Sequence, residues 1–185
     1  MTPRARAGMV VALAALGACK QTIAARTAEF EADANQVTIG MNMRMTEEGT
    51  LKANLAADTA VTPPGETKTR LTRVRLTFMT PSGKEGVLTS KTGDYDPGSQ
   101  IMVARGKVVL IVPGEAGKGT RTIRSEELNW DQRGDRVWSS LDTSIEEGGR
   151  TLYTASFSSD SRFTNIQGTN ASSGSVPVGE GGLRF

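Results

Sequence analysis

The sequence predicts an all-β fold with mostly antiparallel strands. Three observations support this: apolar and polar residues alternate in many short segments, turn signals separate nearly all of these segments, and no amphipathic helix pattern occurs after residue 34. An alternation with period two places the apolar residues on one face of a strand. Turns at such short intervals leave no room for long helices, so the pattern favours stacked strands.

The N-terminus has the layout of a secretory signal peptide over residues 1–18. Arg4 and Arg6 precede an apolar stretch at 9–16, and small residues follow. The stretch is too short to span a bilayer. Its end, Leu16-Gly17-Ala18-Cys19, resembles the lipobox of bacterial lipoproteins, which implies lipidation of Cys19 and membrane attachment through that lipid anchor. Residues 19–34 are expected to form a lipidated tether; the alternative is a buried free cysteine in a short apolar helix.

The charge balance argues against nucleic acid as a partner. The predicted signal contains two of the 22 Lys and Arg residues and none of the 20 acidic residues. Its removal leaves 20 residues of each sign and a formally neutral domain. Nucleic-acid binding needs a basic surface that displaces counterions, so the composition predicts no such function.

The strands follow one another from residue 35 onward. Val37, Ile39 and Met41 alternate with polar residues, and Leu51 and Leu55 belong to the next alternating segment. Further strands are expected at residues 70–79, 86–90, 100–104, 107–112, 120–124, 128–130, 136–140, 144–146, 152–158 and 162–166. Between them lie clusters of Gly, Pro and Asp typical of turns. Residues 169–185 are rich in Gly and Ser and are predicted to be a flexible tail.

An internal repeat with a spacing of 35 residues supports an architecture of stacked hairpins. Leu88-Thr89-Ser90 followed by Tyr95-Asp96 matches Ile123-Arg124-Ser125 followed by Trp130-Asp131. Each copy then turns and enters another strand. In repeat architectures each unit buries its apolar face against a neighbour.

The chain lacks the usual groups of catalytic and metal sites. It has no His, which excludes Ser-His-Asp catalysis and the commonest zinc sites, so no catalytic residue, metal or cofactor is expected. Residues 114–120 resemble a phosphate-binding loop, although the segment that follows is β-like where a helix should begin. Residues 94–98 weakly resemble a calcium loop. A hairpin loop and a turn are the alternative interpretations.

The order of several segments resembles the LptC family of lipopolysaccharide export over residues 35–168. The related LptA and OstA-like domains share these segments, but their order together with an anchored N-terminus favours LptC. The segments are Leu55-Ala56-Ala57-Asp58-Thr59-Ala60, Leu76-Thr77-Phe78, Leu88-Thr89-Ser90-Lys91-Thr92-Gly93-Asp94-Tyr95-Asp96, Gly106-Lys107-Val108, Ser125-Glu126-Glu127-Leu128-Asn129-Trp130-Asp131 and Ala155-Ser156-Phe157-Ser158-Ser159-Asp160.

The resemblance implies a twisted, partly open antiparallel β-jellyroll whose apolar interior holds the acyl chains of lipopolysaccharide. It also implies two protein partners, an inner-membrane ABC transporter that exports lipopolysaccharide and an LptA-like periplasmic bridge protein. Apolar residues on alternating strand positions are the candidates for this interior; a dry core is the alternative for each. They are Val37, Ile39, Met41, Leu55, Leu76, Phe78, Val103, Val109, Ile111 and Trp138.

The anchor departs from the family, whose well-known members carry an N-terminal transmembrane helix. The expected location is the periplasm; the family favours attachment to the inner membrane, whereas Lys20 after Cys19 is also compatible with the outer membrane. Two other functions stay open from the sequence. One is a structural or assembly lipoprotein of the outer membrane with a dry β-sandwich core, and the other is a nucleotide-binding enzyme.

Overall fold

The computed structural model describes residues 36–79, 86–114 and 119–174, and every regular element in these ranges is a strand. The signal peptide, Cys19 and the tether predicted at 19–34 lie outside the described residues. The strands are β1 (Gln36–Glu47), β2 (Thr50–Thr62), β3 (Thr69–Phe78), β4 (Gly86–Asp96), β5 (Ile101–Pro113), β6 (Thr120–Asp131), β7 (Arg136–Ser139), β8 (Thr143–Glu147), β9 (Arg150–Thr154), β10 (Ser156–Ser159), β11 (Gln167–Thr169) and β12 (Ser172–Gly174).

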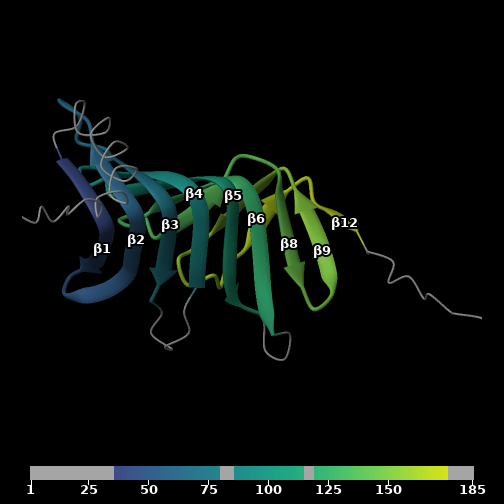
Figure 1. Cartoon of the computed structure of the whole chain (residues 1–185). Coiled ribbons are helices and arrows are strands. Elements are labelled where there is room, and N and C mark those ends of the chain that lie inside the picture. The colour runs from purple at the N-terminus through teal and green to yellow at the C-terminus, as the bar shows by residue number, and fades with distance from the viewer. Residues whose placement is uncertain (1–35, 80–85, 115–118, 175–185) are drawn as a thin grey trace, which may run out of the picture.

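The strands form one antiparallel sheet that forks after β6. Strands β1 to β6 pair in chain order (Figure 1). The first half of β6 pairs with β8 and its last three residues pair with β7. One arm of the fork then continues from β8 to β9 and β12, and the other from β7 to β10 and β11. The described part of the chain confirms the predicted all-β, partly open antiparallel fold.

Near the middle of the long strands the alternation of buried and exposed side chains shifts by one residue. In β3 the buried residues Leu71 and Val74 are three positions apart, and Arg73 between them has a positive φ of 48°. Buried positions alternate with period two on either side of this point. The same spacing of three occurs in β2 from Ala57 to Ala60 and in β6 from Ser125 to Leu128.

In β5 the irregularity is a bulge. Gly106 and Lys107 both have positive φ, 76° and 51°, and the register with β6 shifts between Arg105 and Val108. A bulge bends a strand and increases its local twist. Figure 1 shows the strands curving across the sheet, which wraps them round one hydrophobic core.

The internal repeat corresponds to this bend. Ser90 in β4 and Ser125 in β6 both lie on the inner face directly before the irregularity, and both are buried. The Ser90 hydroxyl donates to the carbonyl of Thr92 at 2.8 Å, and the Ser125 hydroxyl donates to the carbonyl of Asp142 at 3.2 Å. Ser90 thus satisfies a carbonyl at the bend itself, whereas Ser125 satisfies a carbonyl in the connection between β7 and β8.

The sequence interpretation differs from the structure in three respects. Several predicted short strands are halves of single strands, because the bend breaks the alternation; β5, for example, joins 100–104 and 107–112. The strand predicted at 162–166 is wrong, since this segment is a loop in which Phe163 has a φ of 57°. The flexible tail predicted from residue 169 begins too early, because β12 pairs with β9.

Candidate lipid-binding interior

The inner face of the sheet is an almost continuous apolar surface. Its residues come from both halves of the bent strands and belong to one cluster. The most completely buried large side chains are Phe78, Phe157, Leu55, Leu71, Leu76, Leu88, Met102, Leu110, Ile123, Leu128, Val108 and Val112. Burial of each such side chain contributes about 1.5–3 kcal/mol.

An aromatic cluster lies at the centre of this interior. The Phe78 ring makes edge-to-face contacts with Trp130 and with Phe163, each with ring centroids 5.2 Å apart. The Phe163 ring comes from the loop after β10 and covers Gly86, where a β-carbon would lie 2.7 Å from Phe163 Cε2. A glycine at the start of β4 therefore provides the space that the ring occupies.

Asp160 fixes the turn that carries Phe163. Its carboxylate accepts a hydrogen bond from the backbone N–H of Thr164 at 2.8 Å, and its carbonyl accepts one from the N–H of Phe163 at 3.1 Å. Burial raises the pKa of Asp160, but the hydrogen bonds from Thr164 and from the Asn165 backbone, together with the charge of Arg162, outweigh this effect and lower it below its ordinary value. The charged carboxylate is thus the form that holds the turn.

Methionines line the interior along the first strand. Met45 is 4% exposed, whereas Met41 and Met43 are half-buried and pack against the core. Their flexible thioether side chains adapt to irregular apolar neighbours. Because β1 pairs with β2 alone among the described strands, this surface lies at one end of the sheet.

A groove opens the other end of the interior, beside β8 and β9. It has a volume of about 650 Å³, and its apolar lining includes Ile145, Leu152 and Ile166. Arg121 and Glu147 line the same groove and form an ion pair at 3.0 Å, with side chains only 11% and 16% exposed. This groove therefore combines an apolar surface with a partly buried ion pair.

The fork between β7 and β8 is held by side-chain hydroxyl groups. Ser125 and Ser139 hydrogen-bond to each other at 3.1 Å, and Ser139 accepts the backbone N–H of Leu141 at 3.0 Å. Thr143 donates to the carbonyl of Leu141 at 2.9 Å. These bonds satisfy polar groups where β6 exchanges one partner strand for the other.

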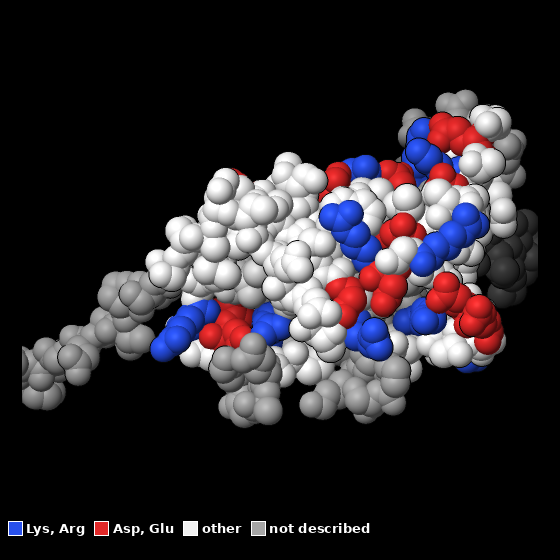
Figure 2. Space-filling model, turned by 180° about the vertical axis from the view of Figure 1, so that it is seen from behind, with Lys and Arg blue, Asp and Glu red and all other residues white. Residues whose placement is uncertain are grey.

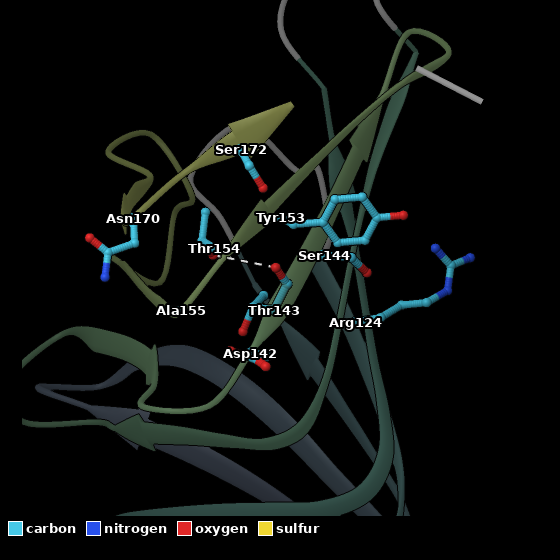
Figure 3. Close-up of a pocket in the computed structure, with 9 residues that line it drawn as sticks. All are labelled: Arg124, Asp142, Thr143, Ser144, Tyr153, Thr154, Ala155, Asn170 and Ser172. Atoms are coloured by element: carbon cyan, nitrogen blue, oxygen red, sulfur yellow. Dashed lines mark hydrogen bonds between the residues drawn. The ribbon is translucent and has the colours of Figure 1, made fainter. Parts of the chain in front are cut away.

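A second groove of about 400 Å³ lies next to the fork (Figure 3). Figure 3 shows Tyr153 and Arg124 on the right of it, and Thr143 and Thr154 to their left, joined by a hydrogen bond. Arg124 pairs with Glu146 at 3.0 Å, and Tyr153 is half exposed. The groove is small and lined largely by polar side chains, so it does not extend the apolar interior.

The outer surface carries charges of both signs. Figure 2 shows Lys and Arg interspersed with Asp and Glu, next to a broad uncharged area towards the C-terminal end. Arg105, for example, lies between Asp94 and Glu127 and is 2.8 Å from the latter. Burial lowers the pKa of Arg105, but hydrogen bonds to these two carboxylates outweigh it and raise the pKa.

The structure brings four of the ten predicted interior residues to the inner face. Leu55, Leu76 and Phe78 are at most 1% exposed, and Met41 packs against the same core. The inner face was correctly assigned in the first half of β2 and in the second half of β3, which pair with each other and where the alternation is clear.

The prediction that the side chain points into the interior is wrong for the other six candidate residues. Val37 and Ile39 lie on the outer face, because the strand changes face at Gly40, which has a φ of 66°; Ile39 is 71% exposed. In β5 and β7 the opposite alternation is buried. The remaining outer-face residues are Val103, Val109, Ile111 and Trp138.

Many of the inner residues that sequence reasoning missed lie in β5 and β6. Met102, Val108 and Leu110 are buried, but both faces of β5 are apolar in sequence, so periodicity alone does not identify the inner one. Trp130 gave a signal through the internal repeat. Phe163 gave none, because it lies in a loop.

The turn predicted at residues 94–98 is described, whereas residues 115–118 of the segment that resembles a phosphate loop lie outside the described residues. Gly114 donates a backbone hydrogen bond to the carbonyl of Gly119 at 2.8 Å, and Thr120 begins strand β6, where a phosphate loop needs a helix. The Asp96 side chain accepts the N–H of Gly98 at 2.9 Å and so closes the turn after β4. No described helix is long and apolar enough to cross a membrane.

Comparison with known proteins identifies the family of the chain. Residues 9–156 match the family described as "Lipopolysaccharide-assembly, LptC-related". The structure is similar to the crystal structure of LptH, the LptA homologous periplasmic component of the conserved lipopolysaccharide transport device from Pseudomonas aeruginosa. That match has 14% identity and a TM-score of 0.49, and covers 63% of this chain and 80% of that chain. A comparison with curated proteins found no match. The chain belongs to the LptC-related family of lipopolysaccharide-assembly proteins, which makes it a transport component and not an enzyme.

Proposed function

We propose that this protein holds the acyl chains of lipopolysaccharide in its interior and passes them from an inner-membrane ABC transporter to an LptA-like bridge protein. The observation that carries the proposal is the continuous apolar inner face between a methionine-lined end and an open groove. Each methylene kept from water in such an interior contributes about 0.8 kcal/mol. Acyl chains of a dozen or so carbons therefore need to bury only part of their length.

The two ends of the sheet suit pairing with neighbouring proteins. At one end β1 offers a 12-residue strand with one partner among the described strands. At the other end β11 and β12 each have one described partner. Unpaired strand edges bind another strand through main-chain hydrogen bonds. We assign β1 to the transporter side and the β11 and β12 edges to the bridge side. The reason is that the open groove lies beside β9, the partner of β12, so an acyl chain could leave the interior there.

The membrane anchor is proposed to be a lipid on Cys19 at the inner membrane. The lipobox-like sequence at residues 16–19 supports it. Mass spectrometry of the membrane-extracted protein tests it. We expect an acylated Cys19 at the N-terminus, with residues 1–18 removed. A protein that keeps residues 1–18 and carries no acyl group on Cys19 would show that the apolar segment itself is the anchor.

Site-specific photo-crosslinking in cells tests the carrier function. A photoreactive residue at Met43, on the inner face, is expected to capture lipopolysaccharide. The matched control is Ile39 on the same strand, whose side chain is 71% exposed on the outer face. Capture at Ile39 alone would contradict the proposal. Capture at neither position would favour a structural lipoprotein with a dry β-sandwich core.

A further inference from the structure

Two buried polar side chains on the inner face have no hydrogen-bond partner among the described residues. They are the indole Nε1 of Trp130 and the hydroxyl of Ser159. The two residues are only 2% and 5% exposed. Polar groups buried in native proteins nearly always have a partner, so each orphan calls for an explanation.

The strand register places these two groups on one row across the inner face. Trp130 of β6 lies opposite Val137 of β7, and Val137 lies opposite Ser159 of β10. Trp130 and Ser159 are thus two strands apart, about 10 Å at the usual strand spacing. A buried valine separates them, and the two polar groups bracket a short stretch of apolar wall.

A flexible side chain borders this row. On its other side Trp130 lies opposite Met102 of β5, whose terminal methyl group is 2.7 Å from the position that a β-carbon of Gly93 would take. Methionine changes its side-chain conformation readily, so this neighbour can move while the strands stay paired. The indole ring itself is held by its edge-to-face contact with Phe78.

The two unpaired groups favour a bound acyl chain that carries an oxygen atom. An indole N–H is a donor only, whereas a serine hydroxyl both donates and accepts. A plain hydrocarbon chain would leave both groups unpaired. A hydroxyl group on the chain accepts from Trp130 or exchanges hydrogen bonds with Ser159, and a site with such groups rejects analogues that lack the oxygen.

We infer that Trp130 and Ser159 are specificity-determining residues that favour hydroxylated acyl chains over unsubstituted ones. The inference rests on the proposed acyl-chain binding and adds a selection step to it. If packing alone retained Trp130, phenylalanine would serve equally well, because it keeps an aromatic ring beside Phe78.

Equilibrium binding of 3-hydroxymyristate and myristate to the purified protein tests the inference. We expect the wild type to bind 3-hydroxymyristate about tenfold more tightly, the effect of one well-formed hydrogen bond. Trp130→Phe should reduce this ratio to about one by weakening only the hydroxylated ligand. Ser159→Ala should reduce it partly, and it provides a second test if the tryptophan variant folds poorly. Trp138→Phe, on the outer face, is the matched control and should keep the full ratio.

The possible results separate the inference from the proposed function. Equal binding of both acids by the wild type, or an unchanged ratio in Trp130→Phe and Ser159→Ala, would overturn the inference while acyl-chain binding stands. Binding of neither acid would contradict the proposed function and the inference with it.

Discussion

Replacement of Phe163 by alanine should destabilise the protein strongly, although the residue lies in a loop. Its side chain is only 5% exposed and packs edge-to-face on Phe78. Loss of a buried phenylalanine side chain costs about 3–5 kcal/mol. The upper half of this range, about 4–5 kcal/mol, is expected because the ring rests on Gly86, which has no side chain that can fill the cavity. Typical domains have about 5–15 kcal/mol of stability, so the loss is large.

Urea unfolding followed by far-UV circular dichroism measures this effect, and a double-mutant cycle locates it. Gly86→Ala alone should destabilise the protein, because the new methyl group would lie 2.7 Å from the Phe163 ring. In the Phe163→Ala background the same change should cost much less, because that methyl group then partly fills the cavity. A loss of less than about 1 kcal/mol for Phe163→Ala, or additive effects in the cycle, would refute the placement of the ring.

Three further predictions concern the loop, the last strands and the surface. The lowered pKa of Asp160 means that its contribution to stability is present above its unfolded value near 3.9 and is lost as the pH falls through the folded value. Asp160→Asn should therefore flatten the decline of stability in acid unfolding; an unchanged pH profile would exclude this role. Gly168→Ala should loosen β11, because a β-carbon would lie 2.5 Å from Thr154, and faster amide exchange in 167–169 would report it. Arg105→Ala should cost at most about 1 kcal/mol in thermal unfolding, since the ion pairs of Arg105 are exposed; a larger loss would mean that the guanidinium has a packing role.

The fold class could be predicted from the sequence because turns and alternation are local signals. The bend could not, because it depends on several neighbouring strands changing face together. Gly40 is the clearest case: glycine tolerates its positive φ, and the change of face there puts Ile39 outside and Met41 inside. A one-residue shift in such a pattern reverses every later side chain.

The interior was partly predictable for a different physical reason. Where one face is polar, as around Leu55 and Leu76, the alternation identified the inner side chains. In β5 both faces are apolar, so the choice between Val109 and Leu110 depends on which neighbours cover each face. Phe163 is buried by a loop that returns over β4, a long-range contact that no local pattern encodes.

The two tryptophans of the chain allow the most direct test of the central claim that acyl chains bind inside the sheet. Trp130 faces the interior and is 2% exposed, whereas Trp138 on the adjacent strand faces outward beside Arg136. In Trp138→Phe, brominated stearate should quench the fluorescence of Trp130 strongly. In Trp130→Phe, it should leave the fluorescence of Trp138 nearly unchanged. Equal quenching in both variants, or quenching of Trp138 alone, would contradict interior binding.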